Sequence, residues 1–325
     1  MFAYIIRRVL YAVPILIGIN VLTFYLFFVV NSPDDMARMH LGMKHVTEEA
    51  VQKWKASHGY DKPLLLNGAA EGIDQVTDTI FFEKSVRLFA FDFGYSDDGR
   101  DISYDISQRM LPSLAIALPA LLLGLLVNIT FALLMAFFRG SYLDTSGVIL
   151  CVVLMSVSGM FYIIGGQFLL AKVFRLMPIS GFAGGIDALK FIVLPVIIGV
   201  VSGIGSGARW YRTFFLEEAG KDYIRTARAK GLSEMLVLFR HILRNALIPI
   251  VTGVVVILPL LFMGSLLTES FFAIPGLGSY TIDAINNQDF AIVRVLVVLG
   301  SVLYILGLIL VDITYTIVDP RVRLT

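Results

Sequence analysis

The sequence predicts an all-α integral membrane protein with six transmembrane helices. Of its 325 residues, 57% are hydrophobic and 16% are charged, and the mean hydropathy is +0.82. A typical soluble domain carries about 25% charged residues, so this chain has too few to cover a water-facing surface. Its apolar runs do not alternate with polar residues, as the strands of an outer-membrane barrel would. The single cysteine, Cys151, cannot form a disulfide within the chain.

Six apolar runs approach or exceed the length of about 20 residues that a helix needs to cross a bilayer. The first follows Arg7 and Arg8, but it is longer than the apolar core of a signal peptide, about 7–15 residues, and lacks a cleavage site. It is therefore predicted to be a membrane anchor. The fourth is short and rich in glycine, and its stretch 202–207 would suit either a wide pathway or close helix packing. The six runs are residues 9–30, 111–138, 147–171, 191–207, 246–268 and 295–317.

The distribution of basic residues predicts that both termini are cytoplasmic. With that orientation, the four cytoplasmic segments hold thirteen basic residues in 62 positions, eight of them in 208–245. The segment 31–110 has nine basic and fourteen acidic residues and would lie outside. This arrangement follows the positive-inside rule. The chain then divides into an anchor helix at 1–30, an extracytoplasmic segment at 31–110, and a five-helix core at 111–325 with a cytoplasmic loop at 208–249.

The extracytoplasmic segment is expected to form a small cap that contains at least one helix. Thr47 is a suitable N-cap for a helix that reaches His58, and Gly59 suits its end. Pro63 prevents a continuation. A tolerated external loop and a docking surface for a partner are equally compatible with this pattern.

The cytoplasmic loop is predicted to form two helices joined at a glycine. Residues 222–230 favour a helix, and Gly231 suits the left-handed position that follows a helix end. Ser233 can cap a second helix, on which Leu236, Phe239, Ile242 and Leu243 would share an apolar face. Such an elbow needs a surface against which to bury that face. It is therefore a candidate for docking into a partner protein, although its basic residues could serve membrane topology alone.

The sequence shows no catalytic motif. The Gly220-Lys221 pair is followed by Asp222 and lacks the upstream glycine of a nucleotide-binding loop, and no His-Glu-x-x-His metal helix is present. The chain is therefore not expected to be an enzyme or to bind a metal. Few charges lie near the spans, chiefly Glu269, Arg294 and Asp312, which is a thin basis for ion coupling. A self-sufficient channel or secondary transporter remains the alternative, although residues 1–160 and 161–325 show no convincing repeat.

The cytoplasmic loop resembles the "EAA" loop of ABC importer permeases, and in particular that of the peptide/nickel branch. The wording Arg225-Thr226-Ala227-Arg228-Ala229-Lys230-Gly231-Leu232-Ser233 is the usual form in that branch, where the eponymous Glu-Ala-Ala is replaced. The N-terminal Tyr4-Ile5-Ile6-Arg7-Arg8 is similar to the B-type member of the permease pair. Further fragments agree in chain order: Gly59-Tyr60-Asp61-Lys62-Pro63-Leu64, Asp92-Phe93-Gly94-Tyr95-Ser96, Arg109-Met110-Leu111-Pro112-Ser113-Leu114, Met177-Pro178-Ile179-Ser180-Gly181, Pro275-Gly276-Leu277-Gly278 and Asp319-Pro320-Arg321.

The resemblance implies a type I importer transmembrane domain in the bacterial inner membrane. It implies a second homologous permease, two ATPase subunits that bind ATP and Mg²⁺, and an extracytoplasmic substrate-binding protein, with no nucleic acid. The chain would hold no cofactor and would form half of the pathway for peptides or related small molecules. Residues 225–233, within the loop 222–249, would be the coupling contact with an ATPase. Residues 68–80 look like extra length relative to the family.

Overall fold

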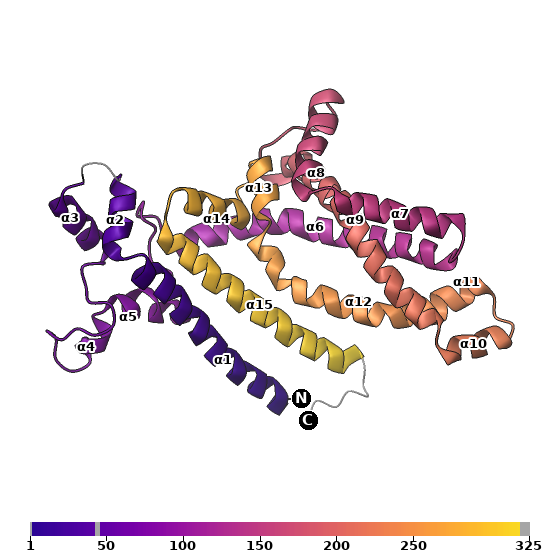
Figure 1. The fold of residues 1–325 in the computed structure, drawn as a ribbon, viewed down its shortest axis with the longest axis horizontal. Helices are drawn as coiled ribbons and strands as arrows, with labels where there is room; N and C mark the ends of the chain where they lie inside the picture. Colours follow the sequence, from indigo (N-terminus) through magenta and orange to yellow (C-terminus); the bar gives the residue numbers. More distant parts are fainter. Residues whose placement is uncertain (1, 43–45, 319–325) are drawn as a thin grey trace. The chain divides into compact units, whose positions relative to one another are not determined.

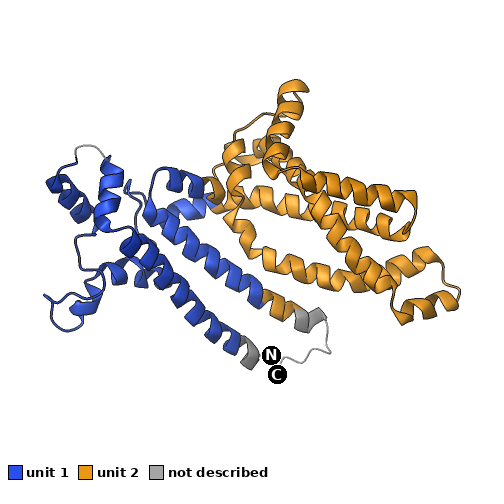
Figure 2. Cartoon of the chain, in the orientation of Figure 1, with its two compact units in different colours: residues 1–109, 280–309, 324–325 blue, residues 110–279, 310–323 orange. Residues whose placement is uncertain are grey.

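The computed structural model describes residues 2–42 and 46–318, and within these residues the chain is built from helices (Figure 1). One isolated β-bridge joins Tyr95 and Asp101. The terminal motif Asp319-Pro320-Arg321 lies outside the described residues. The described residues form two compact units (Figure 2), unit 1 from those up to Arg109 together with Tyr280–Ile309, and unit 2 from Met110–Ser279 together with those from Leu310 on.

Among the described residues, five helical segments are long and apolar enough to cross a membrane, and a bent pair of helices gives a sixth. The prediction of a helical membrane protein is thus confirmed, and the predicted number of six spans is reached when the bent pair is counted as one span. The five are Ile6–Val30 in α1 (Phe2–Phe24) and η1 (Tyr25–Val30), α6 (Ile102–Phe137), α9 (Ala188–Ala219), the run Glu234–Met263 through α11 (Glu234–Leu236), η5 (Val237–Leu243), α12 (Arg244–Ile257) and η6 (Pro259–Met263), and Phe290–Thr314 in α15 (Phe290–Val318).

The third predicted span, residues 147–171, is bent rather than straight. It corresponds to α7 (Tyr142–Ser156) followed by α8 (Gly159–Gly166) and η3 (Gln167–Val173), with an angle of 88° across the break. Val157 is extended, and Ser158 begins the next helix. The apolar run gave no sign of this bend, because hydropathy does not depend on the direction of the backbone.

The fourth span is much longer than the predicted 191–207. Helix α9 continues through Trp210 and Phe215 to Ala219, although charged residues appear from Arg209 onward. A helix satisfies its backbone hydrogen bonds internally, so it can leave the apolar layer without ending. The segment between α9 and α12 is therefore shorter than the polar stretch of the sequence suggests.

The glycines of α9 are close packing positions at its middle. A Cβ atom on Gly205 would lie 2.6 Å from the carbonyl oxygen of Cys151 on α7, and one on Gly207 would lie 2.5 Å from Nδ2 of Asn128 on α6. Gly203 has nothing within 4 Å. Close helix packing therefore accounts for Gly205 and Gly207, in line with the small-residue interfaces of membrane helices.

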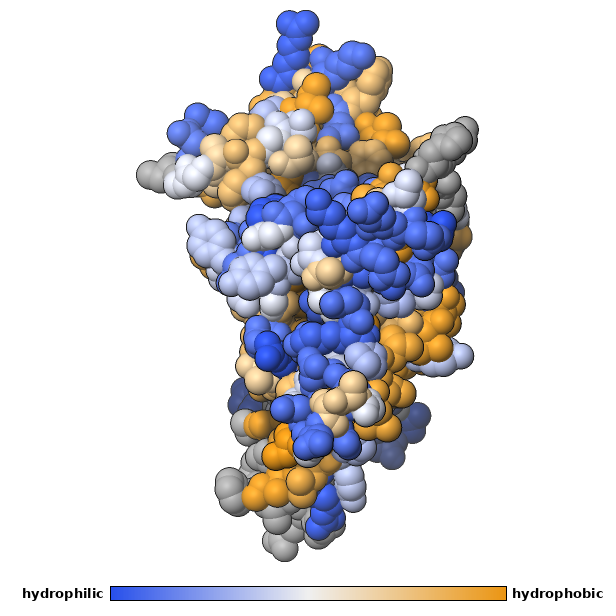
Figure 3. Space-filling model, turned by 90° about the vertical axis from the view of Figure 1, so that its left-hand side faces the viewer, coloured by the Kyte–Doolittle hydropathy of each residue, from blue (hydrophilic) through white to orange (hydrophobic). Residues whose placement is uncertain are grey.

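Within unit 1, the segment between the first two spans folds into short helices, and the view from this side shows hydrophilic residues gathered at mid-height between more hydrophobic areas (Figure 3). Thr47 accepts a hydrogen bond from the Ala50 backbone N–H and Gly59 adopts φ +69°, so the helix expected before His58 is confirmed with both ends. Phe24 and Phe28 of the first span pack with Met36, Trp54 and others in a buried cluster. The short helices are α2 (Pro33–Leu41), α3 (Glu48–His58), α4 (Asp74–Thr77), α5 (Ile80–Lys84) and η2 (Val86–Ala90).

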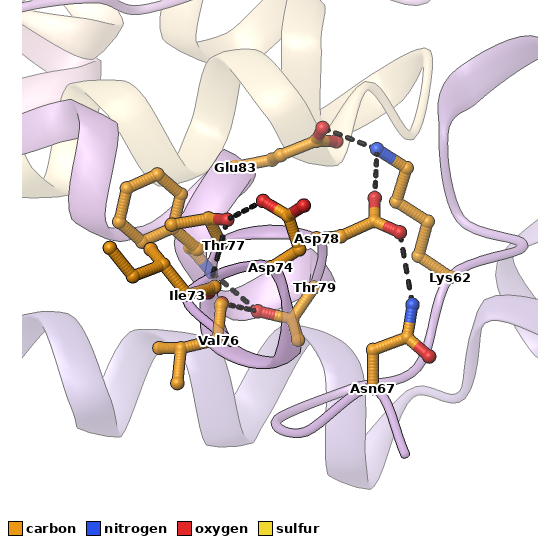
Figure 4. A network of polar contacts seen from close by, with 10 residues as sticks. Lys62, Asn67, Ile73, Asp74, Val76, Thr77, Asp78, Thr79 and Glu83 are labelled. Carbon is orange, nitrogen blue, oxygen red and sulfur yellow. Dashed lines mark hydrogen bonds and ion pairs between the residues drawn. The ribbon is translucent and has the colours of Figure 1, made fainter. Parts of the chain in front are cut away.

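The 68–80 stretch is a loop held at its base by Lys62 (Figure 4). The Lys62 Nζ lies 2.9 Å from Oδ1 of Asp78 and 2.5 Å from Oε1 of Glu83. The Asn67 side-chain amide donates to Asp78 Oδ2 at 2.9 Å. These two carboxylates raise the pKa of Lys62, and Lys62 lowers the pKa of Asp78. This stretch, which contains α4, is therefore closed at its base by ionic contacts.

Unit 2 contains a buried carboxylate at the end of the fifth span. Helices α13 (Leu266–Phe272) and α14 (Leu277–Asn286) flank the Pro275–Gly278 turn, and Glu269 on α13 is 1% exposed. The Glu269 carboxylate accepts backbone N–H groups of Ser265 at 3.2 Å and Ser279 at 3.1 Å. A Cβ on Gly276 would lie 2.2 Å from Glu269 Oε2. The turn therefore closes on this carboxylate and leaves no room for a side chain there.

Candidate functional site

The loop after α9 has the elbow geometry that the sequence predicts. Helix α10 (Asp222–Ala229) ends at Lys230, and Gly231 follows with φ +79°, a conformation that favours glycine. The Ser233 side chain then accepts a hydrogen bond from the Leu236 backbone N–H and caps the next helix. The predicted positions of the glycine turn and of the cap are both confirmed.

Helix α10 buries one face against the membrane helices of unit 2. Ile224 is 0% exposed and Ala227 6% exposed, and both belong to one hydrophobic cluster. That cluster draws residues from α6, α9, η5 and α12: Ala132, Leu133, Tyr211, Phe215, Val237, Leu238, Ile242, Ala246 and Ile250. The elbow is therefore packed onto three long helices and is not a freely hanging loop.

The remaining residues of the 225–233 segment face solvent. Ala227 is buried and Leu232 is half-buried, whereas the others are exposed: Arg225, Thr226, Arg228, Ala229, Lys230, Gly231 and Ser233. The structure thus brings all nine predicted residues into one continuous elbow, seven of them exposed. On the surface opposite the buried face, Arg225 pairs with Asp222 and Arg228 with Glu234, and Lys230 adds a further positive charge.

A bidentate ion pair closes the elbow on itself. Arg228 Nε lies 2.8 Å from Oε1 of Glu234, and Arg228 Nη2 lies 3.0 Å from Oε2. The two residues lie on either side of Gly231, on α10 and α11. A forked guanidinium–carboxylate contact fixes direction as well as distance. It therefore holds the angle between the two helices, with Gly231 as the turn between them.

A second polar chain, which the sequence did not reveal, ties α10 to its neighbours. The Tyr223 hydroxyl donates to the buried Glu218 carboxylate at the end of α9, and Asn245 Nδ2 on α12 donates to the Tyr223 oxygen at 2.8 Å. Burial and the hydrogen bond to Glu218 raise the pKa of Tyr223 to about 12, so the hydroxyl stays protonated and can donate. Lys221 Nζ lies 2.6 Å from Glu218. No local pattern links residues 218, 223 and 245, which meet only through folding.

The predicted apolar face of the second helix is confirmed at Ile242 and Leu243, which pack in the core cluster, and is wrong at Leu236 and Phe239. Leu236 and Phe239 are 41% and 53% exposed, whereas Val237, Leu238 and Ile242 are buried. The reason is that residues 237–243 form a π-helical turn. Its wider turn shifts the inward-facing positions relative to the 3.6-residue period that the sequence argument used. As a result, an apolar patch of Met235, Leu236 and Phe239 lies exposed beside the basic elbow.

The three charges that the sequence placed near the spans are at least partly buried. Glu269 is held by the turn described above, and Arg294 on α15 is 3% exposed. Asp312 is half-buried on the same helix. Among the described residues, no group of three or more potential metal ligands is present.

The described residues thus form an all-helical membrane protein with an exposed, packed elbow between the α9 span and the α12 span. Residues 128–324 match the family model described as binding-protein-dependent transport system inner membrane component, and residues 1–118 match the N-terminal model of the same kind of component. The chain belongs to this family, the permease subunits of ABC importers.

The permease is similar to several curated proteins over almost its whole length. A putative peptide transport system permease protein of Brucella abortus is 33% identical over 328 residues, which cover 99% of both chains. The dipeptide transport system permease protein DppB of Bacillus subtilis is 32% identical, with 99% of this chain and 98% of that one covered. The corresponding DppB of Escherichia coli is 30% identical, with 99% of each covered. The family's members are multi-pass inner-membrane subunits that work with ATPase subunits and other permease subunits.

Proposed function

We propose that this permease forms half of a pathway for peptides and receives the movement of an ATPase subunit through residues 222–249. The peptide cargo is supported by the printed names of its relatives, which describe peptide, dipeptide and oligopeptide transport. The coupling role rests on one observation, namely that the exposed face of α10 is backed by a buried face packed on three long helices. An ATPase groove would contact the basic face and cover the exposed patch of Met235, Leu236 and Phe239.

The proposed assembly contains a second homologous permease, two ATPase subunits and an extracytoplasmic substrate-binding protein. ATP and Mg²⁺ would be bound by the ATPase subunits, because this sequence has no nucleotide-binding loop. Both termini would be cytoplasmic, which places the elbow on the same side as the ATPases and the 31–110 segment on the opposite side. The basic residues of 208–245 and the acidic excess of 31–110 support this orientation.

The packing suggests how a push on the elbow would reach the pathway. Ile224 and Ala227 contact a cluster that includes Leu133 on α6, Phe215 on α9 and Ile250 on α12. Close-packed interiors transmit displacement because they contain little free volume. The Arg228–Glu234 contact and the Glu218–Tyr223–Asn245 chain would keep α10 from rotating separately. Displacement of the elbow would thus move the three helices as a group.

Substitution of Gly231 tests this role without touching any catalytic group. In Gly231→Asp, a side chain is forced into a left-handed backbone conformation, which costs about 1–2 kcal/mol and favours a different elbow angle. We expect ATP hydrolysis by the reconstituted complex to persist while peptide uptake into proteoliposomes falls at least tenfold. Gly140→Asp is the matched control, because Gly140 has φ +78° and, like Gly231, nothing within 4 Å of its Cβ position.

Normal substrate-stimulated uptake in Gly231→Asp, with Gly140→Asp equally normal, would contradict the coupling role. Uptake by the purified chain alone, in liposomes without ATPase subunits, would favour the other class considered, a self-sufficient channel or secondary transporter. In that case the basic elbow would serve topology only.

A further inference from the structure

Unit 1 contains a polar cavity that is not part of the elbow. Its volume is about 770 Å³, and its walls come from the end of α3, from α5 and η2, from the 92–99 segment and from the start of α15. Pockets for small ligands typically have volumes of about 300–1,000 Å³, so a molecule the size of a short peptide would fit. All of its lining residues belong to unit 1.

One wall carries a buried arginine with an unsatisfied donor. Arg294 is 3% exposed, its guanidinium lies 5.1 Å from the centre of the Phe28 ring, and its Nε has no hydrogen-bond partner among the described residues. Within that part of the chain it also forms no ion pair. A guanidinium stays charged in proteins, and an unpaired buried charge is costly. This side chain lines the cavity and forms no direct ion pair there, although the charges of Asp97 and Asp289 act on it from a distance.

A lysine on a second wall repeats this arrangement. Lys84 Nζ lies 5.3 Å from the centre of the Tyr60 ring, and within the described residues it too forms no ion pair. Burial, together with the nearby Arg294 charge, lowers the pKa of Lys84. Tyr60 cannot supply the missing negative charge, because burial raises its pKa to about 12. Two cationic groups thus rest on aromatic rings where a carboxylate would satisfy both.

The opposite charge lies close by on Asp97. Its side chain is 8% exposed, and its Oδ1 lies 3.8 Å from Nε2 of His58. The backbone N–H of Asp97 donates to Oδ2 of Asp289 at 3.0 Å. Burial, and next the charge of Asp289, raise the pKa of Asp97 to about 6, while His58, His40 and Lys84 oppose this rise, so at neutral pH the carboxylate is ionised with His58 at 3.8 Å as its nearest cationic group. An ammonium group would supply a closer partner.

The other charged residues of the lining are already paired. Glu83 binds Lys62 at 2.5 Å, and Arg87 Nη1 lies 3.9 Å from Asp92. The charges without a close ion pair are then two positive ones, on Lys84 and Arg294, and the two negative ones of Asp97 and its neighbour Asp289. A simple anion would be repelled by the two aspartates, and a simple cation by the two basic residues. A molecule with one positive and one negative charge would leave the net charge of the cavity unchanged.

We propose that this cavity binds a zwitterionic amino acid or short peptide, with its carboxylate on Arg294 and Lys84 and its ammonium group on Asp97. The site belongs to unit 1 and is separate from the coupling elbow of unit 2. It does not rest on the proposed coupling role, since binding can be measured without nucleotide and without uptake.

The test is direct binding of dialanine to the purified full complex, without substrate-binding protein and without ATP, by isothermal titration calorimetry. N-acetyl-dialanine lacks the ammonium group and dialanine amide lacks the carboxylate. We expect each blocked form to bind at least tenfold more weakly, because each loses a charge-assisted hydrogen bond. Lys84→Gln and Asp97→Asn should each weaken dialanine binding by about tenfold or more, and Arg294→Gln by more than either.

Lys53→Gln is the matched control, because Lys53 is exposed on α3 and does not line the cavity. It should bind dialanine as the parent does. Arg294 is buried, so Arg294→Gln could weaken binding by unfolding the protein, and Lys84→Gln and Asp97→Asn test the site without that change. All variants should elute as the intact complex in size-exclusion chromatography. Equal affinity for dialanine and its amide, wild-type affinity in Lys84→Gln and Asp97→Asn, or no binding up to about 10 mM would overturn the proposal.

Discussion

Replacing Asp144 by alanine should destabilise unit 2 by about 3 kcal/mol, whereas the same change at Asp187 should cost less than about 0.5 kcal/mol. Both aspartates form an ion pair with a basic residue of α9, and the pairs have nearly equal lengths. Arg212 binds Asp144 in a bidentate contact with two distances of 2.8 Å, and Lys190 binds Asp187 at 2.7 Å. They differ in burial, with side chains 20% and 8% exposed in the first pair and 71% and 68% in the second.

The magnitude follows from what each change leaves behind. Without Asp144, the Arg212 charge is left unpaired in a mostly buried site, and the Gly140 N–H loses its acceptor at 3.0 Å. Breaking a buried pair costs about 3–5 kcal/mol, and we take the lower end because Arg212 keeps some contact with solvent. The pair at Asp187 is open to water, which screens it.

The assay is unfolding of the purified chain in mixed micelles by titration with sodium dodecyl sulfate, followed by tryptophan fluorescence. Trp210, one of two tryptophans, lies two residues from Arg212 and reports on this region. The double variant Asp144→Ala/Arg212→Ala should be more stable than the sum of the single changes predicts, by about 2 kcal/mol. Equal costs for Asp144→Ala and Asp187→Ala, or additive single changes in the double variant, would refute the argument from burial.

Three further predictions use the same unfolding assay or proteolysis. Glu269→Gln should destabilise unit 2 by about 1–3 kcal/mol, because one of its carboxylate acceptors becomes an amide donor facing backbone N–H groups, and an unchanged transition would count against that role. In Lys62→Gln, a protease should cleave the 68–80 stretch faster than in the parent protein, because Asp78 and Glu83 at its base lose their cation. Equal cleavage rates in two folded proteins would show that the ionic contacts are unimportant. The pKa of Asp97 is raised to about 6, so the folded state binds this proton more tightly than the unfolded chain does. The free energy of unfolding should therefore fall, by at most about 3 kcal/mol, as the pH rises from about 4 through about 6. Asp97→Asn should abolish that slope.

The sequence predicted best where a local pattern determines a local structure. Thr47 and Gly59 mark the two ends of α3, and Gly231 and Ser233 mark the turn and cap of the elbow. In each case a single residue satisfies backbone groups within three or four positions of itself. Such contacts depend little on the rest of the fold, which explains why they could be located in advance.

The sequence failed where the determining contact is distant or depends on backbone direction. The Asp144 carboxylate is held by Arg212, 68 positions away, and the Glu269 carboxylate by the Ser279 backbone, 10 positions away. No rule of sequence spacing predicts either contact. The bend after Ser156 occurs inside a continuous apolar run, and the π turn at 237–243 shifts a predicted face. Hydropathy indicates which segments avoid water, and it carries no information on these features.

The bend between α7 and α8 limits what can lie beside this subunit in a bilayer. Around Val157 the helical hydrogen-bond ladder is interrupted, and residues 156–160 are exposed on the chain. The Tyr162 hydroxyl satisfies one of the freed backbone groups, because it donates a hydrogen bond to the Leu154 carbonyl at 2.8 Å. Acyl chains offer no hydrogen bonds, so irregular backbone at membrane depth persists only against protein or water. Acyl chains alone therefore cannot satisfy the backbone groups at the Val157 bend. That side of the chain needs protein or water beside it in the bilayer.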